Sequence, residues 1–281
     1  MLRPKDVLAG VSVFPARTPT LPPATHTNSY ALGTRDVLLV EPATPYEDEQ
    51  RAWIDWARAM TDRNVIGILV THHHDDHVGG LDVLARELDL PVWAHDATVE
   101  RLAPALRARI ARRLGEGDAI VLDGPSPSRW SVLHTPGHAP GHLCLHDAEA
   151  GALVVGDMVA SIGTILVAPG DGDMIAYLAS LERLAALDAK TALPAHGEAI
   201  DEPVKLFRKY VSHRLMREGK VLDAVAAAGT EGADIATLTA RAYDDTPVHL
   251  WPFAQLSLRA HLEKLEREGR VAQAAQRFRV V

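Results

Sequence analysis

The chain has 281 residues, of which 47% are hydrophobic and one is a cysteine, Cys144, so a sizeable core is expected and an internal disulfide framework is excluded. No run approaches the roughly 18 apolar residues of a membrane span, and Met1–Asp6 lacks the apolar region of a signal peptide. We therefore expect a cytoplasmic protein with no membrane partner. The formal net charge is −8, and because residues 201–281 carry 13 Lys or Arg against 11 Asp or Glu, the acidic excess lies in the first 200 residues. That excess disfavours tight, nonspecific binding of nucleic acid.

The predicted elements begin with proline-rich strand fragments and loops over residues 1–24 and then alternate between strands and helices. Strands are predicted over residues 26–33, 37–40, 65–70, 91–94, 119–122, 130–134, 143–146, 153–155 and 191–194. Helices are predicted over residues 50–61, 97–114 and 174–188. The short strands from residue 119 onward predict a second sheet, separate from the one that the earlier strands form.

A cluster of polar side chains follows the predicted buried strand 65–70. Its sequence is Thr71-His72-His73-His74-Asp75-Asp76-His77-Val78-Gly79-Gly80, and leucines at helical spacing begin at Leu81. Imidazole nitrogens and carboxylate oxygens suit zinc and related divalent metals. A turn between a strand and a helix leaves such side chains free to converge. The turn is therefore the leading candidate for a metal site.

Three further motifs occur later in the chain, each at the end of a predicted strand. They are Thr135-Pro136-Gly137-His138, Val155-Gly156-Asp157 and Pro194-Ala195-His196-Gly197. Together with His72-x-His74-x-Asp76-His77, and in this order, they resemble the motifs of the metallo-β-lactamase superfamily. The resemblance implies an α+β fold, a four-layer αβ/βα sandwich, with metals bound at one edge between the two sheets.

The resemblance also implies a site for two metals, expected to be Zn²⁺, with Mn²⁺ or iron as alternatives. Asp157 would bridge the two metals. The other ligands would be His72, His74 and His138 for one metal, and Asp76, His77 and His196 for the other. A hydroxide shared by the metals would be the nucleophile. Asp76 would orient the attacking water and pass on a proton.

Other polar side chains near the motifs receive interpretations in which they bind no metal. They are His73 and Asp75, expected to point away from the metals; His142, expected to support a ligand; His134 and Cys144, expected to be structural; and His26, expected at the surface or the edge of the core, with a position lining the pocket as the alternative. The arginines between residues 101 and 113 favour a solvated helix face over a cationic rim for an anionic substrate. The turn Glu41-Pro42-Ala43 departs from the family's pattern, which more often has aspartate first. This departure affects the expected shape of the loop and not the expected metal site.

The tail predicts a separate module. Helices are expected over residues 204–228, 235–242 and 249–268, before a turn at 269–271 and a terminal strand. This pattern is typical of a winged helix. We expect residues 1–202 to form the catalytic domain and residues 203–281 a winged-helix-like domain. The segment Gln255–Val271 is similar to the tail of the superfamily branch around the animal β-lactamase-like protein 2 and its bacterial, glyoxalase-II-like relatives. In that branch this module more often shapes the pocket than it reads DNA.

The resemblance implies a metal-dependent hydrolase. The true β-lactamases of the superfamily lack an acid at the position of Asp157, so the resemblance disfavours antibiotic resistance as the main role. An aromatic content of 5% provides no run of base-stacking side chains. The leading hypothesis is hydrolysis of a small-molecule ester or thioester, with a CoA- or carrier-linked acyl group as the partner. The alternatives are a single-stranded RNA endonuclease, like the animal member of the branch, a mononuclear-iron persulfide dioxygenase, and a DNA-binding regulator with a vestigial hydrolase domain.

Overall fold

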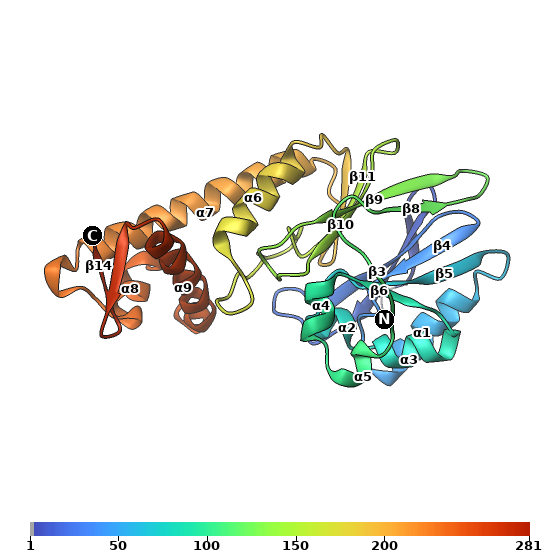
Figure 1. Cartoon of the computed structure of the whole chain (residues 1–281), viewed down its shortest axis with the longest axis horizontal. Helices are drawn as coiled ribbons and strands as arrows, with labels where there is room; N and C mark the ends of the chain where they lie inside the picture. The colour runs from blue at the N-terminus through green and yellow to red at the C-terminus, as the bar shows by residue number, and fades with distance from the viewer. Residues whose placement is uncertain (1–2) are drawn as a thin grey trace. The chain divides into compact units, whose positions relative to one another are not determined.

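The computed structural model describes residues 3–281 (Figure 1). Met1 and Leu2 lie outside the described residues; they are the first residues of the expected catalytic domain and of the segment expected to contain no signal peptide. The chain divides into two compact units. The first comprises Met1–Thr135, Gly141–Thr164 and Asp188–Pro203, and the second comprises Pro136–Pro140, Ile165–Leu187 and Val204–Val281. Two internal segments thus group with the C-terminal residues. The domains expected from the sequence, 1–202 and 203–281, remain a proposal.

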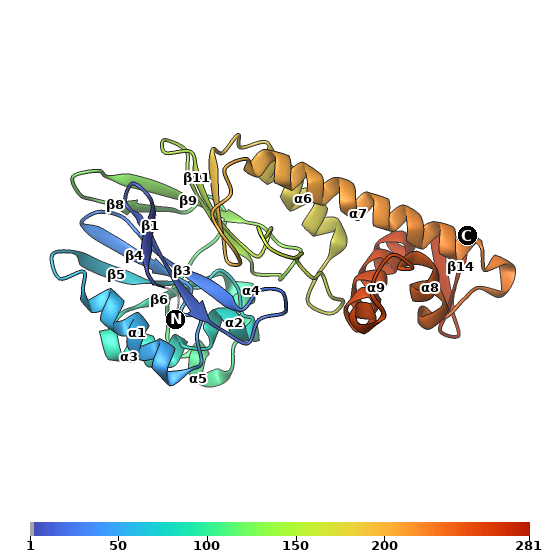
Figure 2. The same cartoon turned by 180° about the vertical axis from the view of Figure 1, so that it is seen from behind.

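The first unit contains two mixed β-sheets (Figures 1 and 2). The larger sheet has its strands in chain order: β1 (Lys5–Leu8), β2 (Val11–Arg17), β3 (His26–Leu32), β4 (Asp36–Val40), β5 (Asn64–Leu69), β6 (Val92–Ala94) and β7 (Ile110–Arg113). The smaller sheet has the order β12 (Thr191–Pro194), β11 (Ala152–Gly156), β10 (Leu143–Asp147), β9 (Ser128–His134) and β8 (Ala119–Leu122). Strands β4 to β7 run parallel to one another, and so do β11 and β12.

Helices cover the outer face of the larger sheet (Figure 1). They are α1 (Glu47–Arg58), α3 (Leu81–Leu88), α4 (Asp96–Arg101) and α5 (Pro104–Arg107), and the short α2 (Asp75–Val78) lies within the polar turn after β5. Along β4 the side chains alternate between the two faces of the sheet. Leu38 packs in the cluster that includes Leu145 of the smaller sheet, whereas Leu39 packs in the cluster that includes Trp53 of α1. Burial on both faces fixes the register of the strands whose ends carry the polar motifs.

The helix expected over residues 97–114 is wrong in its last part, where the chain forms the edge strand β7. Pro104 begins a new short helix, α5, because proline suits the first turn of a helix and not its interior. Ile110 pairs with β6, and the Arg112 guanidinium lies 5.1 Å from the centroid of the Trp93 ring. The pairing of this segment with β6 and the contact between Arg112 and Trp93 stabilise a strand, although the sequence pattern of the segment favours a helix.

Two arginines of this segment make exposed ion pairs on the surface. Arg109 lies 2.7 Å from Asp82, and Arg113 lies 2.6 Å from Asp96. These pairs agree with the interpretation of the segment as a solvated face, because the charges are neutralised by acids of the same unit.

The second unit contains four α-helices, two short 3-10 helices and a hairpin. The α-helices and strands are α6 (Met174–Ala185), α7 (Pro203–Ala226), α8 (Ile235–Ala242), α9 (Trp251–Arg267), β13 (Val271–Ala274) and β14 (Arg277–Val280). One core joins Val225 of α7, Leu238 of α8, Leu262 of α9 and Phe278 of β14. These last three helices with a two-stranded wing are the predicted winged-helix module (Figure 2). Among residues 3–281, every helix is too short or too polar to cross a membrane.

Candidate metal centre

The polar motifs of the first unit lie in turns at the carboxyl ends of parallel strands. That edge is where side chains from neighbouring strands meet in an open α/β sheet. Six of the seven predicted ligands are found there: His72, His74, Asp76 and His77 after β5, Asp157 after β11, and His196 after β12. The motifs expected from the sequence therefore come from both sheets of the unit.

Four of these side chains converge around one point. The Nε2 atom of His77 lies 3.6 Å from Oδ1 of Asp157 and 3.8 Å from Oδ1 of Asp76. The Nε2 atom of His196 lies 3.3 Å from Oδ1 of Asp157 and 3.5 Å from Oδ2 of Asp76. Both imidazoles thus direct the same ring atom at the same two carboxylates.

The spacing of these atoms fits a divalent cation better than hydrogen bonds. Hydrogen bonds of this kind are about 2.7–3.2 Å long, whereas ligands at about 2.1 Å from a tetrahedral metal lie about 3.4 Å apart. His77 is fully buried; its Nδ1 atom faces the carboxylate of Glu41, whereas its Nε2 atom has no partner with hydrogen-bond geometry among the described residues. Polar atoms are rarely buried in that way unless a further partner satisfies them. The residues present therefore fit a metal.

His72 and His74 form a second group of nitrogen donors. The Nε2 atom of His72 lies 3.0 Å from Nδ1 of His74, and the other nitrogen of His72 lies 3.0 Å from the hydroxyl of Thr71. His72 is fully buried and His74 is half-buried. At this distance the two rings are in hydrogen-bond contact, and the same two nitrogens lie close enough together to serve as donors to another metal.

The seventh predicted ligand, His138, lies in the second unit, within Pro136–Pro140. Its Nδ1 atom lies 2.8 Å from the carbonyl oxygen of Leu166. A carbonyl only accepts, so Nδ1 carries the proton and Nε2 carries the lone pair, which is the arrangement common for metal-binding histidines. His138 therefore presents the tautomer that a ligand requires, and its place in the ligand set remains a proposal.

His196 is held by the first strands of the larger sheet. Its Nδ1 atom donates to the carbonyl of His26 at 3.0 Å, which leaves Nε2 on the side of the carboxylates. The amide of Asn28 donates to the carbonyls of Pro194 and Gly197 at 2.9 and 2.8 Å, on either side of His196. The turn that carries the histidine is thereby fixed to β3.

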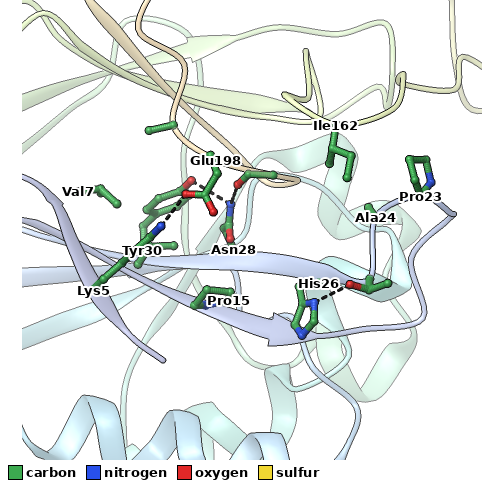
Figure 3. Close-up of a pocket in the computed structure, with 14 residues that line it drawn as sticks. Lys5, Val7, Pro15, Pro23, Ala24, His26, Asn28, Tyr30, Ile162 and Glu198 are labelled. Atoms are coloured by element: carbon green, nitrogen blue, oxygen red, sulfur yellow. Dashed lines mark hydrogen bonds and ion pairs between the residues drawn. The ribbon is translucent and has the colours of Figure 1, made fainter. Parts of the chain in front are cut away.

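A cavity of about 150 Å³ adjoins this turn (Figure 3). Tyr30 lies in its wall, where the hydroxyl donates to the Pro194 carbonyl at 2.7 Å and burial raises the pKa of the phenol. Lys5 and Glu198 form an ion pair of 2.6 Å in the same wall (Figure 3). His26, for which the sequence predicts a surface or core-edge position, also lines the cavity.

His142 supports Asp157, in agreement with the role that the sequence predicts for it. Its Nε2 atom accepts the backbone N–H of Asp157 at 3.0 Å. Its Nδ1 atom therefore carries the proton, which it donates to the hydroxyl of Thr135 at 2.8 Å. The imidazole thus ties the turn after β11 to the end of β9, and a neutral ring suffices for both bonds.

Glu41 is a supporting residue that the sequence analysis missed. It follows β4 with a φ of 64°, is 1% exposed, and places Oε1 3.1 Å from Nδ1 of His77. It also accepts a hydrogen bond from the Thr71 hydroxyl. A carboxylate on the far nitrogen of a ligating histidine orients the ring and makes it a better ligand. The sequence signal that could have identified Glu41 is an acidic residue directly after a buried strand. In the structure that strand, β4, pairs with β5, which leads into the metal turn.

The electrostatics of the cluster favour a cation. Burial acts to lower the pKa of His77, but the surrounding carboxylates, of which Glu41 has the largest effect, raise this pKa well above its ordinary value. Burial acts to raise the pKa of Asp157, but the imidazoles of His196 and His77 hold it well below the usual range. The protein thus gathers positive charge around buried carboxylates, and a bound metal would take the place of those protons.

Replacing Glu41 by glutamine is expected to weaken metal binding by about 10- to 100-fold, because His77 loses the carboxylate that orients its ring. Competition with a chelator measures this affinity. Glu49→Gln is the matched control, since Glu49 is also a buried acid of this unit, 2% exposed, but contacts Arg17 instead. Equal metal affinity in the two variants would show that Glu41 has no role in the centre.

Comparison with known proteins identifies two families within the chain. Residues 22–196 match the metallo-beta-lactamase superfamily, and residues 235–279 match the beta-lactamase associated winged helix domain. A metallo-beta-lactamase family protein from Thermus thermophilus superposes with a TM-score of 0.76 and 25% identity over 98% of this chain and 99% of its own. A protein crystallised in a di-iron-bound form has a TM-score of 0.53 and 31% identity over 69% of this chain and 97% of its own.

Curated relatives extend the likeness to named enzymes. A beta-lactamase-like protein 2 homolog of Drosophila melanogaster is 29% identical over 87% of this chain and 84% of its own length. An atrochrysone carboxyl ACP thioesterase of Pseudocercospora fijiensis is 31% identical over 88% and 71%. A hydroxyacylglutathione hydrolase of Xylella fastidiosa is 40% identical over 44% and 43%. These matches confirm the predicted α+β fold with its C-terminal winged helix.

Proposed function

The chain belongs to the metallo-beta-lactamase superfamily, and we propose that it is a dinuclear hydrolase of a small-molecule ester or thioester. The observation that carries the proposal is the convergence of two imidazoles on two carboxylates at 3.3–3.8 Å. That separation suits ligands of a shared cation. Relatives named as a thioesterase and as a hydroxyacylglutathione hydrolase support acyl chemistry.

The proposed centre holds two Zn²⁺ ions, because imidazole and carboxylate donors together suit zinc. Mn²⁺ and iron are the alternatives, and the similarity to a protein crystallised in a di-iron-bound form supports iron as one of them. Asp157 would serve both ions. The remaining ligands would be His72, His74 and His138 for one ion, and Asp76, His77 and His196 for the other. Among the described residues of the first unit, Asp76, His77 and His196 lie close enough together to hold a metal, and so do Glu41, His72 and His77.

The chain's own residues divide the remaining work of catalysis. When bound, the metals supply a nucleophile from water near neutral pH and polarise the acyl oxygen of the substrate. Asp76 is the proposed catalytic residue, because its side chain keeps 17% exposure against 9% for Asp157. It accepts the proton of the attacking water at a carboxylate oxygen and returns it to the leaving group. Cys144 is fully buried and takes no part as a nucleophile.

The proposed substrate is an acyl thioester carried on CoA or on a carrier protein. The match to the relative named as an ACP thioesterase covers 88% of this chain. The acidic excess of the first 200 residues acts more strongly against a long polyanion such as RNA than against CoA, which carries only a few phosphate charges. Single-stranded RNA is kept as the alternative substrate in the test. The cytoplasmic location and the role of the winged helix stay predictions.

A substrate panel tests this function. The zinc-loaded protein is assayed against acyl thioesters, simple esters and single-stranded RNA. We expect thioester turnover that is lost in Asp76→Ala, since the attack on a carbonyl needs the carboxylate to take the water's proton. RNA cleavage that is lost in the same variant, with no thioester turnover, would contradict the proposal.

A further inference from the structure

The segment that carries His138 is held by helix α6 of its own unit. The carbonyl of Gly137 accepts the backbone N–H of Asp173 at 2.8 Å. A Cβ atom at Gly137, where φ is +135°, would lie 2.2 Å from the Cα atom of Tyr177, so only glycine allows this approach. The backbone beside His138 therefore has one position against α6. What remains to be fixed is the direction of the imidazole.

The direction of the ring is set by a loop. The Nδ1–H of His138 donates to the carbonyl of Leu166 at 2.8 Å. Leu166 lies between β11 and α6, in residues 157–173, which form no helix or strand. A carbonyl in such a stretch has no ladder of backbone hydrogen bonds to fix its direction, so side chains packed against the loop must do so.

Arg214 of helix α7 supplies such a contact. It is 4% exposed, and its Nη2 donates to the carbonyl of Ile165, the residue before Leu166. Its Nη1 donates to the hydroxyl of Ser257 on α9 at 3.4 Å. The guanidinium carbon lies 5.5 Å from the centroid of the Tyr177 ring, on the helix that holds Gly137. One planar group therefore joins α7, α9, α6 and the loop.

We propose that Arg214 is a positioning residue that orients His138 for metal binding, an inference that rests on the ligand set of the proposed function. The carbonyls of Ile165 and Leu166 belong to consecutive peptide planes, which are linked by only two soft dihedral angles. Holding the first carbonyl restricts the direction of the second, and the second holds the imidazole. Arginine suits this role because its rigid fork donates in several directions from one plane.

Arg217, one turn along α7, provides a matched control. It is also a buried arginine, 8% exposed, and lies 4.6 Å from the centroid of the Tyr243 ring. Its guanidinium donates to the carbonyl of Ala242 and to Asp245, both at 2.8 Å. It thus resembles Arg214 in burial, in its aromatic contact and in binding a carbonyl, but it binds the end of α8.

The test measures metal affinity in the full-length protein. Co²⁺ is titrated against a competing chelator, and its absorption spectrum reports the ligand geometry. We expect Arg214→Met to weaken one of the two metals by about 10-fold, the lower end of the effect of an outer partner. Arg217→Met should bind both metals as the wild type does. Arg214→Lys, which keeps one charged donor, should recover part of the affinity.

A double variant shows whether Arg214 acts through His138. In a His138→Ala background, Arg214→Met should cause no further loss of Co²⁺ affinity, because the ring that it orients is gone. An equal further loss there, or an equal loss in Arg214→Met and Arg217→Met, would overturn the proposal. If Arg214→Met does not fold, Arg214→Lys is compared with Arg217→Lys by the same criteria.

The same titration separates this inference from the proposed function. If His138→Ala retains both metals with the wild-type spectrum, the ligand assignment is wrong and the inference falls with it. If the Arg214 variants behave as expected but no thioester is hydrolysed, only the substrate assignment fails, because the titration uses no substrate.

Discussion

Asp157→Asn is expected to lose one of the two metals and to lower kcat/KM by about 1,000-fold or more, which corresponds to about 4 kcal/mol of transition-state stabilisation. Oδ1 of Asp157 lies 3.3 Å from Nε2 of His196 and 3.6 Å from Nε2 of His77, so this carboxylate is close to both histidines proposed to hold one ion together with Asp76. An amide carries no charge to offset two cations at close range. Metal analysis after dialysis, together with thioester kinetics, measures both effects.

Asp147→Asn is the control for that substitution. Asp147 is a buried acid of the same sheet, 5% exposed, at the opposite end of the β10–β11 hairpin from Asp157. Its Oδ1 accepts the backbone N–H groups of Glu149 and Ala150, both at 3.1 Å, and an amide oxygen can accept the same bonds. The variant should keep both metals and its activity. If Asp157→Asn behaves in the same way, Asp157 does not bridge metals.

Asp76→Ala is expected to lower kcat by about 100- to 10,000-fold when metal is supplied in excess. Asp76 lies 3.5 Å from His196 and 3.8 Å from His77, but its side chain is the more exposed of the two carboxylates. Removing it takes away the proposed proton acceptor as well as one ligand. The decrease in kcat should therefore persist at metal concentrations at which both metal sites are fully occupied. Steady-state kinetics at a series of metal concentrations would measure it.

The neighbouring Asp75 provides the control for this prediction. It lies on the same short helix, α2, and is exposed to solvent. Asp75→Ala should leave kcat and metal affinity close to those of the wild type. Recovery of wild-type kcat in Asp76→Ala with excess metal would mean that Asp76 serves as a ligand only, and that another group accepts the proton.

The metal motifs could be predicted from the sequence because each is local and each ends a strand. Between Thr71 and Gly80, four candidate ligands occur within a few residues, and Asp157 and His196 also follow strands that the apolar pattern identifies. Parallel strands bring their carboxyl ends to one edge, so local patterns suffice to gather these side chains. The structure places His72, Asp157 and His196 at strand ends as that argument requires.

What could not be predicted depends on contacts between distant parts of the chain. Glu41 supports His77 only because β4 runs beside β5; the sequence shows an acid at the end of a strand but not which strand lies next to it. Strand β7 exists because it pairs with β6, although its own residues fit a helical pattern. The grouping of residues 136–140 and 165–187 with the C-terminal helices depends on contacts such as the one between Arg214 and Ile165.

Metal titration of the metal-free protein tests whether the centre needs two metals. Zn²⁺ is added in steps, and bound metal per chain is measured beside the rate of thioester hydrolysis. We predict that activity rises until two equivalents are bound, because the donor set offers ligands for two ions that share Asp157. Full activity with a single iron per chain, accompanied by oxygen consumption, would contradict a dinuclear hydrolase.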